Sequence, residues 1–225
     1  MDGKQMTKDQ EQSEVIHRLV QAIESDADNW SAYVDLVSAL TAAHSLPQAE
    51  ELGLKALARF SDLPVARDEL QYALGNVYYQ AGDFDRANHF FSTIEAKRLK
   101  HDATLMQAQS WYGQRQYKRA LAFALTAVQQ DPNDVMAQDL LGDLWLSQND
   151  LKRAKQAFEM ALLQQVDDFR GNFGRGLIAL IEQGLDDNPW LKRAQLRNPE
   201  RFVQEQEKVD DLLTVLKGGQ HGQGS

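Results

Sequence analysis

Apolar residues recur along this chain at the spacing of one helix face, and the whole pattern repeats at a nearly fixed interval. The segment from Val135 to Val166 contains one copy, which reads as an apolar helix, a short polar turn and a second apolar helix. Ala154 in that second helix has counterparts at successive intervals of 34, 33, 38 and 34 residues, at Ala120, Ala87, Ala49 and Val15. A period in this range is typical of stacked helical hairpins, so the sequence predicts an all-α solenoid.

Two copies of the pattern resemble the tetratricopeptide repeat, which places Leu-Gly, an aromatic residue, Ala and a second aromatic residue at fixed positions. One copy has Leu74-Gly75, Tyr78, Ala87 and Phe91, and the other has Leu141-Gly142, Trp145, Ala154 and Phe158. The remaining copies depart from the pattern at the second aromatic position, where they have Gly53 and Ala124. Four copies nevertheless share one register over residues 10–180. The resemblance to the tetratricopeptide repeat family implies a right-handed α-solenoid.

The repeat register predicts how the chain is divided. The predicted parts are a flexible N-terminus 1–9, a solenoid 10–197, a C-terminal capping helix 198–217 and a flexible tail 218–225. Within the solenoid we expect a capping half repeat at 10–29, repeats at about 30–66, 67–100, 101–134 and 135–168, and a partial fifth repeat at 169–197. Pro64 is expected to begin a longer connection between the first two repeats. Asn188-Pro189 and Asn198-Pro199 each read as an N-cap followed by the first residue of a helix.

Composition narrows the class of partner. The formal net charge is -9, which disfavours binding to nucleic acid or to anionic membrane surfaces, because both depend on cationic patches. The chain has no cysteine and no apolar stretch of the length that a bilayer requires. We therefore expect a cytoplasmic protein whose partner is neither nucleic acid nor a membrane.

Catalytic chemistry has little support in the sequence. The five histidines do not show the spacing of metal ligands, and no cluster of polar groups resembles an active site. Glycines 171, 174 and 176 lie inside an expected helix with no preceding strand, so close helix packing explains them better than a phosphate loop. We expect no enzymatic activity, no metal and no cofactor.

The resemblance also implies where a partner would bind. In the family, four positions on the first helix of each repeat line a concave groove that holds extended peptides or helices. Carried over to this chain, the groove residues that we single out are Tyr72, Asn76, Tyr79, Leu105, Gln109, Tyr112, Met136, Asp139, Asp143, Arg170 and Phe173. The family members that bind a C-terminal carboxylate in this groove do so with cations that are missing here, so that class of ligand is rejected.

The groove residues predict the chemistry of the partner. Tyr72, Tyr79 and Tyr112 would form an apolar platform, and Asn76 and Gln109 would bond the backbone of the ligand. The acidic pair Asp139 and Asp143 would select a basic side chain. We therefore expect an unknown protein or peptide that has apolar and basic residues. The alternative is that these aromatic residues only pack against the neighbouring repeat or the protein's own tail.

The C-terminal helix allows a second function. Phe202, Val209 and Leu216 are spaced by seven residues, which would suit a coiled-coil homodimer. The same helix could instead cover the apolar edge of the last repeat, or fold back into the groove. The sequence thus favours a non-catalytic protein-binding scaffold, with structural self-assembly through the C-terminal helix as the alternative.

Overall fold

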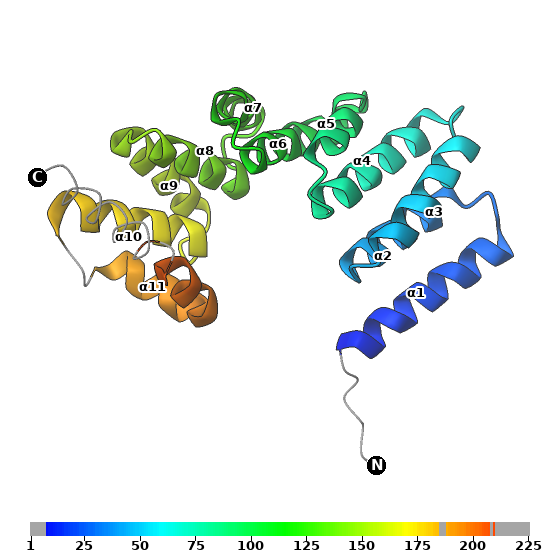
Figure 1. Cartoon of the computed structure of the whole chain (residues 1–225), viewed down its shortest axis with the longest axis horizontal. Helices are drawn as coiled ribbons and strands as arrows, with labels where there is room; N and C mark the ends of the chain where they lie inside the picture. The colour runs from blue at the N-terminus through cyan, green and yellow to red at the C-terminus, as the bar shows by residue number, and fades with distance from the viewer. Residues whose placement is uncertain (1–7, 185–187, 208, 210–225) are drawn as a thin grey trace, which may run out of the picture. The chain divides into compact units, whose positions relative to one another are not determined.

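The computed structural model describes residues 8–184, 188–207 and 209, and every regular element among them is a helix (Figure 1). The residues before Lys8, Leu216 and the predicted tail 218–225 lie outside the described residues. The prediction of an all-α repeat fold is confirmed. The helices form two compact units, which divide between Gln130 and Asp131.

The first unit is a series of helical hairpins preceded by one helix. Its helices are α1 (Lys8–Ser25), α2 (Trp30–Ala42), α3 (Leu46–Arg59), α4 (Pro64–Gln80), α5 (Phe84–Ser92), α6 (Lys97–Gly113) and α7 (Tyr117–Gln130). The pairs α2 with α3, α4 with α5, and α6 with α7 form the hairpins, and α1 packs against α2. The first helices of successive hairpins also pack on one another, α2 on α4 and α4 on α6.

The second unit repeats this arrangement. Its helices are α8 (Val135–Ser147), α9 (Leu151–Gln164), α10 (Phe169–Gln183) and α11 (Pro189–Arg197), followed by helical residues 199–207 and 209. Helices α8 and α9 form one hairpin, α10 packs on both, and α11 packs on α10. The predicted caps at the two Asn-Pro pairs are confirmed. The Asn188 side chain accepts a hydrogen bond from the backbone N–H of Leu191, and Asn198 accepts one from Arg201.

Two first helices are longer than the repeat pattern predicts. Helices α4 and α6 have 17 residues, whereas α2 and α8 have 13. The prediction that Pro64 begins a longer connection is wrong, because Pro64 is the first residue of α4. At that position the fixed φ of proline suits the helix and its missing N–H would be unpaired anyway. Helix α6 begins at Lys97, four residues before the expected start of the third repeat, and the preceding helix α5 has only nine residues.

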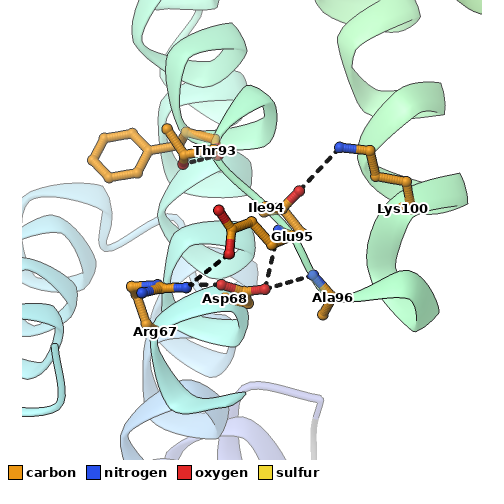
Figure 2. Close-up of polar contacts among 8 residues, drawn as sticks. Arg67, Asp68, Thr93, Ile94, Glu95, Ala96 and Lys100 are labelled. Atoms are coloured by element: carbon orange, nitrogen blue, oxygen red, sulfur yellow. Dashed lines mark hydrogen bonds and ion pairs between the residues drawn. The ribbon is translucent and has the colours of Figure 1, made fainter. Parts of the chain in front are cut away.

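A buried carboxylate in α4 holds the early start of α6. Asp68 is 3% exposed and accepts hydrogen bonds from the backbone N–H groups of Glu95 and Ala96, at 3.1 and 2.6 Å (Figure 2). Ala96 is the N-cap residue of α6 and has no side-chain oxygen with which to cap that helix. Lys100 donates to the carbonyl of Ile94 across the same connection. A side chain of one hairpin therefore satisfies the backbone at the start of the next.

Small residues let the helices approach closely. The alanine that defines the repeat period is completely buried in each hairpin, at Ala49, Ala87, Ala120 and Ala154. Val15 in α1, which the register places at the same position, is 37% exposed. Elsewhere a glycine faces a large ring: a Cβ added to Gly75 would lie 2.5 Å from Phe91. These contacts give the hairpins the dense packing that protein interiors require.

The helix that follows Asn198 covers the last hairpin of the second unit. The Phe202 ring lies 5.8 Å from the ring of Phe173 in an edge-to-face arrangement, and Phe202 is 9% exposed. Val209 packs against the same cluster, which also contains Phe169 and Ala194. The two described members of the predicted heptad therefore contact their own chain.

Candidate partner-binding surface

The clearest candidate surface lies on the first helices of the first unit. Tyr72, Asn76 and Tyr79 follow one face of α4, and Gln109 and Tyr112 follow the same face of α6. All five side chains are half-buried, so each packs against neighbouring residues and keeps a part that a partner can contact. Because α4 packs on α6, these residues form one surface, which we call the aromatic face. The predicted neighbour Leu105 is 5% exposed and offers little area to a partner.

Each tyrosine of the aromatic face rests on an aromatic residue of its own hairpin. The ring centroid of Tyr72 lies 5.6 Å from that of Phe91, and that of Tyr79 lies 5.6 Å from that of Phe84. Tyr112 has the same relationship to Tyr117 at 5.7 Å. Rings supported in this way lose little further conformational entropy on binding, which favours affinity.

Two acidic residues, Glu69 and Asp102, lie near Tyr72 on the aromatic face. Burial raises the pKa of Tyr72, as do the charges of Asp102 and Glu69, while a hydrogen bond with Asn76 acts in the opposite direction. Glu69 forms a close ion pair with Arg98. Asp102 is exposed and has no ion pair within the described ranges. A cation of a partner could therefore pair with Asp102 beside a neutral phenol.

The predicted groove residues of the second unit are arranged differently. Met136 is 59% exposed. Asp143 is held by Arg170, whose Nε donates to both carboxylate oxygens at 2.7 and 2.8 Å. Arg170 also lies 3.7 Å from Glu205. Because the chain already supplies a cation to Asp143, the prediction that Asp139 and Asp143 together select a basic ligand needs correction.

Asp139 does not offer a negative charge at neutral pH. It is 8% exposed, and its Oδ1 atom has no hydrogen-bond partner in the described structure. Burial, followed by the charge of Asp168, raises the pKa of Asp139 to about 9. Asp139 and Asp168 share a side-chain hydrogen bond, so a protonated Asp139 donates to Asp168. This carboxyl group belongs to the packing of α8 against the start of α10.

Phe173 also belongs to the interior. It is 4% exposed and lies between Phe169, at 5.9 Å, and Phe202, at 5.8 Å. For this residue the alternative stated from the sequence, packing within the protein's own chain, describes the structure. The helix after Asn198 covers it.

The structure adds a feature that sequence reasoning missed. An arginine lies over an aromatic ring eight residues earlier in three hairpins: Arg86 over Tyr78 at 4.2 Å, Arg119 over Trp111 at 4.7 Å and Arg153 over Trp145 at 4.6 Å. In the sequence these pairs recur in register with the alanine period, and that recurrence is the signal that could have found them.

The described residues form neither a metal site nor a membrane span. No group of three or more His, Asp or Glu side chains there is arranged to hold a metal ion. Within the same ranges, no helix is both long enough and apolar enough to cross a membrane.

These observations define a class of protein. The helical hairpins, their fixed period and the aligned faces of their first helices are those of a helical-repeat protein. Residues 72–135 match the tetratricopeptide repeat family.

Solved structures share this fold at low sequence identity. PilF of Pseudomonas aeruginosa is 14% identical with a TM-score of 0.70, over 88% of this chain and 90% of that one. BtubC (BKLC) of P. vanneervenii is 16% identical with a TM-score of 0.61, over 89% and 90%. YrrB, a tetratricopeptide repeat protein with an unusual peptide-binding site, is 20% identical with a TM-score of 0.57, over 84% and 97%. No curated protein matches the chain.

Proposed function

We propose that this protein is a non-catalytic scaffold of the cytoplasm that binds a peptide or helix of a partner protein on the aromatic face. The observation that carries the proposal is the set of three half-buried tyrosines, each supported from behind by an aromatic residue of its own hairpin. Aromatic residues that are already fixed in place are typical of interface hot spots. The peptide-binding site of YrrB, which has a similar fold, supports the same general use.

The ligand expected on the aromatic face has apolar residues and at least one basic residue. The apolar residues would pack on the tyrosine rings, while Asn76 and Gln109 would bond the ligand backbone. Asp102 takes the place of Asp139 and Asp143 as the acidic group that selects the basic residue, because it is exposed and unpaired within the described ranges. The net charge of -9 is consistent with a partner that is neither nucleic acid nor an anionic membrane.

The test begins with a selection of binding peptides from a random peptide library, using the full-length protein. The selected peptides are then titrated by calorimetry against the wild type, Tyr72→Ala and Tyr112→Ala. Each substitution should weaken binding by about 1–3 kcal/mol, the range of an aromatic hot spot. Asp102→Asn should weaken the binding of peptides that have a basic residue more than the binding of neutral peptides.

The matched control is Leu125→Ala, which removes an apolar side chain that is 44% exposed on α7, the second helix of a hairpin in the same unit. Circular dichroism verifies that each variant is folded. The proposal fails if the tyrosine variants bind as the wild type does while Leu125→Ala weakens the interaction.

A further inference from the structure

The recurring arginine stacks differ in how their charges are neutralised. In the hairpin of α4 and α5, Arg86 donates to Glu50 at 2.8 Å and to Asp83 at 2.6 Å. Glu50 also accepts a hydrogen bond from the Tyr78 hydroxyl at 2.9 Å. In the hairpin of α8 and α9, Arg153 lies 3.5 Å from Asp150. In both hairpins an acidic residue accompanies the stacked arginine.

The hairpin of α6 and α7 lacks both acids. The position of Asp83 and Asp150 is occupied by Gln116, and the position of Glu50 is occupied by Asn88. The Gln116 amide nitrogen donates to Gln114, whereas the aspartates at this position cap α5 and α9. Arg119 therefore stacks on Trp111 with no carboxylate partner among the described residues.

Buried polar groups at the equivalent repeat positions are also without partners in the described structure. Asn88 is 6% exposed, and both polar atoms of its amide have no hydrogen bond in the described structure. The same holds for the indole Nε1 of Trp111. One repeat earlier, the residues at these positions are Glu50 on α3 and Tyr78 on α4, and they bond to each other. The polar contact between Glu50 and Tyr78 therefore has no counterpart between Asn88 and Trp111.

Two further cations extend the surface. Arg115 and Lys118 are exposed beside Arg119, and neither forms an ion pair within the described ranges. Asp85 accepts a hydrogen bond from Gln114 of this turn. The turn is thus locally basic in a chain whose net charge is -9.

We propose that the turn between α6 and α7 binds a carboxylate side chain of an acidic peptide, with Arg119 as the main contact. The ligand carboxylate would occupy the place that Glu50 and Asp83 fill in the preceding hairpin, where one acid bonds the stacked arginine and the other also caps the helix. Arg115 and Lys118 would attract further acidic residues. This surface is separate from the aromatic face and takes ligands of the opposite charge.

The probe is a capped peptide of alternating glutamate and alanine, titrated into isotopically labelled full-length protein and followed by NMR at low salt. The control peptide has glutamine in place of every glutamate. Saturable shifts should concentrate on the Trp111 indole and on the amides at the start of α7, and only the glutamate peptide should produce them. Absence of a saturable shift, or equal shifts at all four tryptophans, would overturn the proposal.

Variants locate the contact. Arg119 is exposed, so Arg119→Gln should lower the affinity for the glutamate peptide about fivefold, the upper range for an exposed ion pair. Asn88→Glu should abolish binding, because it restores the internal carboxylate that Glu50 on α3 provides to Arg86 one repeat earlier. Arg153→Gln is the matched control and should leave the Trp111 shifts unchanged, since Arg153 already pairs with Asp150. If Asn88→Glu does not fold, Arg119→Gln alone decides, and unchanged affinity in that variant rejects the site. Tyr72→Ala should bind the glutamate peptide normally, which separates this site from the aromatic face.

Discussion

Gly142 in α8 lies directly against the ring of Phe158 in α9, so closely that a Cβ on the glycine would be 2.5 Å from the ring carbon Cε1. Gly75 and Phe91 repeat this relationship in the first unit. At the same two repeat positions the other hairpins have Val37 with Gly53 and Ala108 with Ala124. In three of these pairs a larger residue on one helix is thus accompanied by a glycine on the other. In the fourth pair, Ala108 and Ala124, both residues are alanine.

Gly142→Ala should destabilise the second unit by about 1–3 kcal/mol, the usual cost of inserting a methyl group into a filled core. The loss should appear in urea unfolding followed by circular dichroism. In the double variant Gly142→Ala/Phe158→Leu, the smaller partner should make the added methyl group less costly than it is beside Phe158. Equal costs of the glycine substitution in both backgrounds would show that the ring contact does not limit packing.

Ala124→Phe should also be destabilising, because Ala124 is completely buried and faces a hairpin partner that already has a Cβ. Adding Ala108→Gly should recover part of the lost stability, since it recreates the glycine and phenylalanine combination of the neighbouring hairpin. A double-mutant cycle of unfolding free energies measures the coupling, which we expect to be about 1 kcal/mol in favour of the pair. Additive effects would contradict the exchange of volume between the two positions.

The pKa of Asp139 predicts a pH dependence of stability. Because burial raises this pKa to about 9, the folded chain holds one more proton than the unfolded chain between the ordinary value of 3.8 and about 9. The contribution of Asp139 to stability is therefore present at low pH and decreases as pH rises through that window. In Asp139→Asn the amide can donate to Asp168 without binding a proton. This variant should therefore be more stable than the wild type at pH 8, by at least about 1 kcal/mol. At pH 4 the two proteins should be similarly stable.

The measurement is the unfolding free energy of the two proteins from pH 4 to pH 9. Asp167→Asn is the control, because Asp167 is the neighbour of Asp168 in the sequence and its side chain is 61% accessible. That variant should follow the pH dependence of the wild type. A constant difference between Asp139→Asn and the wild type across the range would reject the buried proton.

Gly82 occupies a turn position that has a positive φ in every hairpin of the register. Its φ is 76°, and the equivalent residues His44, Arg115 and Asn149 have φ values of 56°, 58° and 59°. No atom lies within 4 Å of a Cβ added to Gly82, so substitution there tests the backbone alone. Gly82→Ala should cost about 1 kcal/mol in thermal or urea unfolding.

Gly82→Asn should cost less than Gly82→Ala, since asparagine tolerates the left-handed conformation and Asn149 already adopts it. If alanine were as stable as glycine at this turn, the backbone there would not be restricted to a positive φ.

The sequence was sufficient for the fold because the repeat period depends on local spacing. Completely buried Ala49, Ala87, Ala120 and Ala154 are the residues from which the period was read. The helix caps at the Asn-Pro pairs were equally visible, because capping depends on near neighbours. The resemblance also led to the aromatic face, where the tyrosines are half-buried.

The predictions that were wrong concern residues that contact each other across long sequence separations. Arg170 pairs with Asp143, 27 residues earlier in the chain, and neither residue alone signals the other. Phe173 is covered by Phe202, which lies on a helix outside the repeat pattern. The early start of α6 depends in the same way on Asp68, 28 residues before Ala96. Local patterns cannot reveal such partners until the fold brings them together.

The carboxylate of Asp68 also bears on how the first unit folds. The backbone N–H groups of Glu95 and Ala96 are satisfied by α4, so the first turn of α6 gains this support only when the preceding hairpin is in place. In a chain of repeats, stability is the sum of the intrinsic energy of each repeat and a coupling energy between neighbours. Asp68 increases the coupling energy between two hairpins. These hairpins should therefore unfold together as one cooperative block, so that partial unfolding stops at the edge of the pair.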